Sequence, residues 1–145
     1  MISMGIESKI QNSKLLTYVF GYWPSFHDAQ VLNIALETQP PYERPATLKC
    51  AIYVFEITSQ IDETGHYVLR HRVVVNLRFD GFTNLRIEGF ENFNSLSGLK
   101  VIDISNRQLQ DLKFEVAIDG NLGMTANFLC KSVTVESVEP YIVDG

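Results

Sequence analysis

Apolar and polar residues alternate along most of the chain beyond residue 30, with the period of two that is typical of β-strands. The longest alternation runs from Tyr67 to Phe79, and shorter ones predict strands at 32–37, 99–104, 112–118 and 124–128. Residues 48–57 are apolar at both odd and even positions, which is typical of a central strand covered on both faces. After residue 128 the apolar phase slips to Val133 and Val135, and this slip predicts a β-bulge over residues 130–132.

The first twenty residues carry the spacing of a helix instead. Their apolar stripe recurs one helical turn apart and consists of Leu15, Leu16, Val19 and Phe20. Ser13 is a candidate N-cap for a second helical piece, Gly21 supplies a C-terminal stop, and Pro24 prevents continuation. These signals predict an N-terminal helix over residues 5–20, followed by a turn over residues 21–28.

A turn signal follows the longest alternating run. Asp80-Gly81 is a hairpin dipeptide, and a three-residue loop with the glycine in a left-handed bulge keeps the apolar faces of both strands together. The prediction is a hairpin with the loop Phe79-Asp80-Gly81, which sets Val75 opposite Leu85 and Val73 opposite Ile87. Its register sets Arg72 opposite Glu88, which is a favourable pair of opposite charges.

One N-terminal helix and about seven or eight strands predict an α+β, mostly β fold, with an antiparallel sheet arranged as a sandwich or a partly open barrel. We expect a single domain over residues 1–145, with its β-rich body at 29–138, because 145 residues bury a sufficient core without metals or disulfides. Cys50 and Cys130 lie in apolar, strand-like surroundings, and we expect both to be buried free thiols.

Charge and hydropathy narrow the possible partners. The formal net charge is −5, which argues against nucleic acid, because phosphate binding needs clustered Lys and Arg. No apolar run is long enough to cross a bilayer and no signal peptide is evident, so we expect a cytoplasmic protein without a membrane partner. The modest basic stripe predicted for one sheet face is expected to be solvated, and it consists of Arg70, Arg72, Arg78 and Arg86.

A Trp-Pro-Ser-Phe-His-Asp motif lies just before the first predicted strand and is the most distinctive feature of the chain. Trp23 and Phe26 are large apolar side chains that need burial, and Pro24 blocks a helix there. His27 and Asp28 need hydrogen-bond partners. We predict a structural role for the motif, in which Asp28 orients the imidazole or caps the turn.

Catalysis by the motif would require Ser25, His27 and Asp28 to converge as a triad. Ser25 and Asp28 point to opposite sides of an extended segment, and no glycine-flanked nucleophile elbow surrounds the serine. The sequence therefore predicts no catalytic residue and no enzyme.

A metal site would require three or four convergent ligands. His66 and His71 are five residues apart, so on one strand they face opposite sides, and His71 falls on the apolar face as a predicted core histidine. We expect no metal site and no cofactor.

The motif, continued by Ala29 and running into a strand, resembles the signature of the immunity protein 50 family of bacterial polymorphic-toxin systems. The family often carries a glutamate after this alanine, where the present chain has Gln30. The resemblance implies a small cytoplasmic antidote that binds a co-produced toxin, its cognate protein partner, and blocks it without catalysis. It assigns no contact residues.

We therefore predict the surface that contacts the toxin from the expected exposure of each segment alone. The most exposed segments are the 39–45 loop, the turn at 62–66 and the polar connection at 91–97, and their candidate binding residues are Tyr42, Asp62, Glu63, Glu91 and Phe93. Two other classes of function remain open from the residues. One is a small hydrolase or lyase that uses His27 and Asp28 in a pocket, and the other is a small-ligand carrier that uses the interior of a β-barrel.

Overall fold

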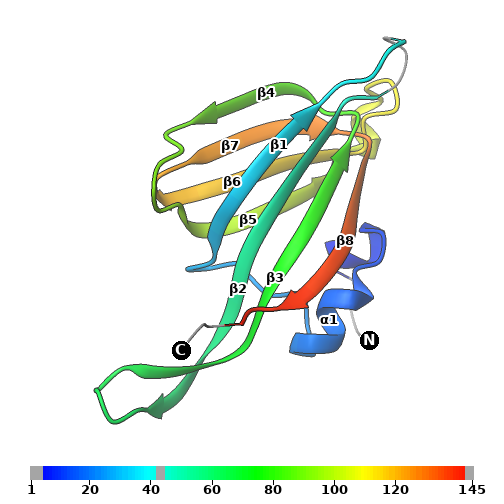
Figure 1. Ribbon diagram of the computed structural model, residues 1–145. Helices are drawn as coiled ribbons and strands as arrows, with labels where there is room; N and C mark the ends of the chain where they lie inside the picture. Colours follow the sequence, from blue (N-terminus) through cyan, green and yellow to red (C-terminus); the bar gives the residue numbers. More distant parts are fainter. Residues whose placement is uncertain (1–4, 42–44, 143–145) are drawn as a thin grey trace.

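The computed structural model describes residues 5–41 and 45–142. Within these residues the strands are β1 (Gln30–Glu37), β2 (Thr47–Ile61), β3 (Tyr67–Asp80), β4 (Thr83–Glu88), β5 (Ser95–Asp103), β6 (Phe114–Leu122), β7 (Thr125–Cys130) and β8 (Ser132–Pro140). They form one open antiparallel sheet in the order β4-β7-β6-β5-β1-β2-β3-β8 (Figure 1). The predicted α+β, mostly β fold with an antiparallel sheet is therefore confirmed.

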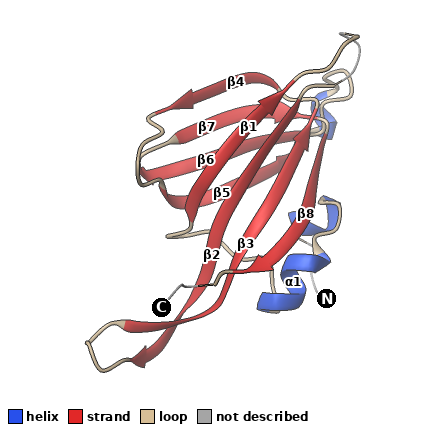
Figure 2. Cartoon of the chain, in the orientation of Figure 1, coloured by secondary structure: helices blue, strands red, loops and turns tan. Residues whose placement is uncertain are grey.

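The sheet bends between β1 and β5, so that β4, β7, β6 and β5 form one layer and β1, β2, β3 and β8 form another (Figure 2). The strands β1 and β5 pair only near their starts, where Gln30 lies opposite Ser95. Phe79 on β3 and Phe128 on β7 meet edge to face between the layers, with ring centroids 5.0 Å apart. The hydrophobic core therefore lies between the two halves of the sheet.

The second strand, β2, has the predicted central position only over residues 48–53, where it lies between β1 and β3. The prediction is wrong for residues 55–57, which extend beyond β1 and leave Ile57 50% exposed. Its alternate residues Leu48, Cys50, Ile52 and Val54 face the core, and Ala51 and Tyr53 between them are buried as well. Burial on both sides of the strand explains why its sequence lacks alternation. Cys50 and Cys130 are buried free thiols, as predicted.

The N-terminal segment corrects the prediction of one helix over residues 5–20. It forms a 3₁₀ helix, η1 (Ile6–Lys9), and then an α-helix, α1 (Lys14–Phe20). Between them Gln11 pairs with the free edge of β8: its N–H donates to the carbonyl of Val133 and its carbonyl accepts from the N–H of Val135, both at 2.9 Å. A continuous helix would forfeit both bonds, so pairing with the sheet interrupts it.

The helix α1 lies beside β3 and β8 and buries Leu16 and Phe20 (Figure 1). It begins after Ser13, as predicted, although the serine side chain makes no capping hydrogen bond. It ends at Gly21, whose φ of 81° is the left-handed conformation that the stop signal requires.

The predicted hairpin around the loop Phe79-Asp80-Gly81 is wrong. β3 pairs with β2 and β8, whereas β4 pairs with β7, so Arg72 and Glu88 lie in different halves of the sheet. The edge of β3 that the hairpin would need is occupied by β8, which arrives much later in the chain. Gly81, with φ of 68°, instead marks the point where the chain crosses between the halves.

The phase slip after residue 128 is a second crossing rather than the predicted bulge over 130–132. β7 ends at Cys130 in one half, and β8 begins at Ser132 in the other. Lys131 between them donates its N–H to the carbonyl of Asp80 at 2.8 Å, so the two crossings lie side by side.

The strands β2 and β3 extend beyond the rest of the sheet as a two-stranded arm formed by residues 55–72 (Figure 1). A register shift between Val54 and Glu56 leaves His71 exposed, with φ of 54°, at the root of this arm. The prediction of a core histidine is therefore wrong. The imidazole instead contacts the ring of Phe20 edge to face, with centroids 5.8 Å apart. After η2 (Ser105–Arg107) no further helix occurs in the described part of the chain.

Candidate functional site

The Trp-Pro-Ser-Phe-His-Asp motif connects α1 to β1. Phe26 is 1% exposed and Trp23 is half-buried, and their rings lie 5.7 Å apart. Phe26 and Asp28 both have left-handed backbone, with φ of 65° and 66°. The N–H of Asp28 donates to the carbonyl of Leu96 at 2.8 Å, and the N–H of Leu96 donates to the carbonyl of Ala29. The motif thus ties the start of β1 to β5 across the bend of the sheet.

The polar side chains of the motif point toward solvent. The Nδ1 atom of His27 lies 3.2 Å from Oδ2 of Asp28, and the imidazole side chain is 65% exposed. Ser25 Oγ accepts a hydrogen bond from the backbone N–H of His27 at 3.2 Å. The serine therefore contacts the histidine backbone rather than its ring, so the arrangement is not that of a Ser-His-Asp triad.

A groove of about 470 Å³ separates the motif from the root of the arm. This groove is here called the motif groove. Its lining residues are Phe20, Tyr22, Trp23, Pro24, Ser25, Phe26, His27, Val54, Phe55, Glu56 and Ile57. Aromatic rings dominate these walls, and the carboxylate of Glu56 is the charged group of the opposite wall. A groove of this kind fits an apolar or aromatic side chain of a partner.

The Glu56 carboxylate already has partners. Arg70 Nε donates to it at 2.8 Å, and the Tyr22 hydroxyl donates to it at 3.3 Å. The hydrogen bond from Arg70 holds the pKa of Glu56 below its ordinary range. Burial and the neighbouring Glu56 carboxylate raise the pKa of Tyr22. Glu56 is therefore ionised and paired with Arg70, which does not suit a general acid or base.

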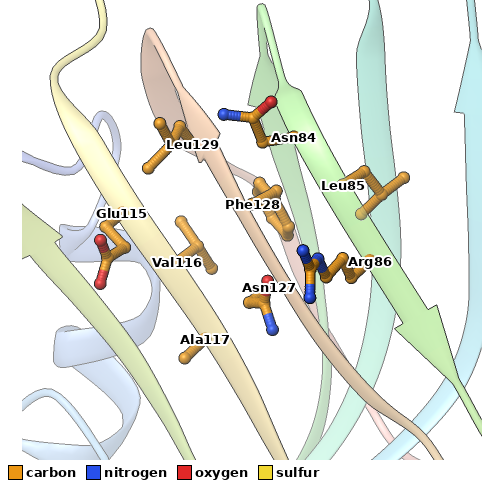
Figure 3. A pocket seen from close by; sticks show the side chains of 9 residues that line it. All are labelled: Asn84, Leu85, Arg86, Glu115, Val116, Ala117, Asn127, Phe128 and Leu129. Carbon is orange, nitrogen blue, oxygen red and sulfur yellow. The ribbon is translucent and has the colours of Figure 1, made fainter. Parts of the chain in front are cut away.

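A second hollow, of about 730 Å³, lies across β4, β7 and β6 (Figure 3). Arg86 lies opposite Asn127, Asn127 lies opposite Ala117, and Ala117 lies opposite Lys100 on β5. The small Ala117 side chain between larger polar neighbours leaves this face open. Its charges are mixed, because Glu115 also lines the hollow.

The predicted basic stripe is wrong. Arg70 pairs with Glu56, and Arg78 pairs with Asp80 and Glu136. The third arginine, Arg72, donates to the Tyr53 hydroxyl at 2.6 Å and lies over the rings of Tyr53 and Tyr141. The fourth, Arg86, lies in the other half of the sheet.

The candidate binding residues Glu91 and Phe93 lie in the loop between β4 and β5, and both are exposed. The prediction that the whole segment 91–97 is exposed is wrong, because Asn94, Ser95 and Leu96 are buried. Asn94 Oδ1 accepts hydrogen bonds from the backbone N–H groups of Glu91 and Met124, at 2.9 and 3.0 Å. Its amide nitrogen donates to the carbonyl of Glu91 at 2.9 Å. A buried asparagine therefore fixes the loop.

The candidates Asp62 and Glu63 lie at the tip of the arm, well away from the β4–β5 loop (Figure 1). Asp62 Oδ1 accepts hydrogen bonds from the N–H groups of Thr64 and His66, at 2.9 and 3.0 Å, and so closes the tip. The hydrogen bond from the Thr64 hydroxyl, together with these backbone bonds, holds the pKa of Asp62 below its ordinary range. The last candidate, Tyr42, lies outside the described residues.

The described residues also bear on metal binding and on membrane insertion. Among residues 5–41 and 45–142, no three His, Cys, Asp or Glu side chains converge closely enough to hold a metal ion. No helix in these ranges combines the length and apolar character needed to span a bilayer.

The fold and the motif define a small β-sheet protein whose most distinctive aromatic residues, Trp23 and Phe26, lie in or against its core. The chain belongs to the immunity protein 50 family, because the family model described as Immunity protein 50 matches residues 12–141. The match covers the motif and all eight strands of the sheet. No curated protein and no solved structure matches the chain.

Proposed function

We propose that this protein binds a cognate bacterial toxin in the cytoplasm and neutralises it by covering part of its surface. Membership of the immunity protein 50 family over residues 12–141 is the observation that carries this proposal. An inhibitor without catalytic groups acts by occupation, which for a stable complex takes about 800 Å² on each partner. The protein requires no cofactor for this role.

In this proposal the Trp-Pro-Ser-Phe-His-Asp motif has a structural role. Phe26 anchors the segment in the core, and the bond from Asp28 to Leu96 joins β1 to β5. Asp28 orients the exposed imidazole of His27. The motif thereby maintains the bend of the sheet and the surfaces on both sides of it.

The two alternative functions have less support. For a hydrolase or lyase, His27 and Asp28 lie beside the motif groove, but Ser25 contacts the backbone and Glu56 is paired with Arg70. For a small-ligand carrier, the centre between the sheet halves is filled by Phe79 and Phe128, which are at most 2% exposed.

The test is co-expression with the C-terminal domain of a polymorphic toxin encoded by the neighbouring gene. We expect the wild-type protein to restore growth, and we expect His27→Ala to restore it equally, because occlusion does not need the imidazole. A complex of the two purified proteins should form with both versions. Growth arrest despite soluble wild-type protein would contradict the proposal, and loss of protection with His27→Ala alone would favour the enzyme.

A further inference from the structure

The β4–β5 connection and the β6–β7 turn lie side by side at one end of the sheet (Figure 1), and together they carry three exposed apolar residues. Phe90 is 50% exposed, Phe93 is 48% exposed and Leu122 is 60% exposed. Glu88, the last residue of β4, and Glu91, in the loop that follows it, are also exposed. These five residues are here called the loop–turn patch. Exposed apolar groups next to charges are typical of protein-binding surfaces rather than of bare sheet ends.

The backbone beneath the loop–turn patch is held rigidly. The amide of Asn94, which is 4% exposed, bonds both to Glu91 in the loop and to Met124 beyond the turn. Gly123 allows the two segments to approach closely, since an added Cβ there would lie 2.5 Å from the carbonyl oxygen of Phe93. A preorganised surface loses little conformational entropy on binding, so more of its contact energy remains as affinity.

The charge of the loop–turn patch defines the chemistry of its partner. Neither segment 88–99 nor segment 120–130 contains a lysine or an arginine. Within the described residues, Glu88 and Glu91 have no ion-pair partner, whereas Glu115 pairs with Arg107 and Asp119 pairs with Lys100. Two unpaired carboxylates beside two phenylalanine rings complement Lys and Arg side chains, which bind carboxylates and the faces of aromatic rings.

Two other surfaces of the described residues have weaker features for docking. The arm exposes Ile57, Ile61 and Tyr67, but it is a two-stranded ribbon without neighbours, and such ribbons are only marginally stable. The hollow of Figure 3 is lined by both Arg86 and Glu115, so its charge favours no partner of either sign. Of these three surfaces, the loop–turn patch is the one that combines exposed apolar residues, one sign of charge and a hydrogen-bonded backbone.

We propose that the loop–turn patch docks on a basic protein surface, with Phe90 and Phe93 as apolar anchors and Glu88 and Glu91 as partners for Lys or Arg. This inference rests on the proposed function and assigns the basic surface to the toxin. Binding there would cover the patch and pair both carboxylates. The attraction should speed association and weaken as salt is added.

The experiment compares matched substitutions on the loop–turn patch and on the arm. Glu91→Lys and Phe93→Ser change the patch, whereas Glu63→Lys and Tyr67→Ser make the same kinds of change at exposed positions of the arm. Calorimetric titration with a catalytically inactive form of the neighbouring toxin domain gives the affinity of each variant. Thermal melting verifies that each variant is folded, and Glu91→Lys keeps the test valid if Phe93→Ser unfolds.

We expect each patch variant to weaken binding at least tenfold and each arm variant by about twofold or less. Wild-type affinity should also fall as salt rises. A wild-type complex that tolerates both patch variants, or that is insensitive to salt, would overturn this inference while leaving the proposed function intact. No complex with the wild-type protein would contradict both.

Discussion

At the scale of single residues, Phe26 combines two requirements that rarely coincide. Its ring is almost fully buried, and its φ of 65° lies in the left-handed region that disfavours residues with a Cβ. Phe128 is equally buried but lies within β7, at ordinary extended geometry. The two positions therefore separate the contribution of the ring from that of the backbone.

We predict that Phe26→Ala lowers the free energy of unfolding by about 3–5 kcal/mol, because a large cavity replaces the ring. Phe26→Gly should be no more harmful than Phe26→Ala, since glycine removes the left-handed penalty of about 1 kcal/mol. At Phe128, glycine should cost about 0.5–1 kcal/mol more than alanine. Urea unfolding followed by Trp23 fluorescence measures all four variants, and a clear excess cost of glycine at position 26 would contradict the strained backbone.

The sequence predicts the burial of Phe26 from residue type, but it does not reveal the backbone angle. For His71 the prediction of burial itself is wrong. Its odd position in the alternating run predicts the core face, yet the register shift between Val54 and Glu56 alters the phase and leaves the ring exposed. Alternation predicts the buried face of a strand only while the strand keeps its register with its neighbour. A register shift belongs to the pairing of two strands, so the sequence of one strand does not reveal it.

At the scale of elements, local pattern locates the strands but not their neighbours. The hairpin predicted around Asp80-Gly81 satisfies every local rule, including an apolar face and the pair Arg72–Glu88. It fails because β8 takes the same edge of β3 and buries Val133 and Val135 there. Competition between a near and a distant partner is decided by the whole core, which a local pattern does not describe.

We predict that engineered disulfides distinguish these two pairings. Asn76 lies opposite Ser137, and its amide nitrogen donates to the serine hydroxyl at 2.9 Å, so Asn76→Cys/Ser137→Cys should oxidise readily. Arg72→Cys/Glu88→Cys should remain reduced, because those residues lie in different halves of the sheet. Mass spectrometry after mild oxidation detects the loss of two hydrogens. A disulfide between positions 72 and 88, with none between positions 76 and 137, would contradict the observed pairing and support the hairpin.

At the scale of the molecule, the fold brings together residues that the sequence keeps apart. Glu91 and Phe93 are candidates from exposure alone, whereas Phe90 and Leu122 enter the loop–turn patch only once the sheet is assembled. Asn94, which belongs to a predicted polar connection, is the buried link that joins the two segments.

The two buried thiols report on whether the halves of the sheet fold together. Cys50 lies on β2 in one half and Cys130 lies at the end of β7 in the other. Burial raises the pKa of Cys50 to about 12. Burial, together with the nearby Asp80 carboxylate, raises the pKa of Cys130 to about 12. At pH 8 the folded protein therefore holds both as unreactive thiols, whereas in the unfolded chain a thiol of ordinary pKa is partly ionised and reactive.

We predict that iodoacetamide at pH 8 leaves both thiols unmodified in native buffer and alkylates them at one common urea midpoint. Phe79 and Phe128 join the two halves of the sheet in one core, so unfolding of one half would expose the core residues of the other. The chain should therefore unfold as a single domain. Cys50→Ala and Cys130→Ala each leave one thiol and allow the two midpoints to be measured separately. Midpoints that differ after correction for the stability of each variant would mean that the two halves unfold independently.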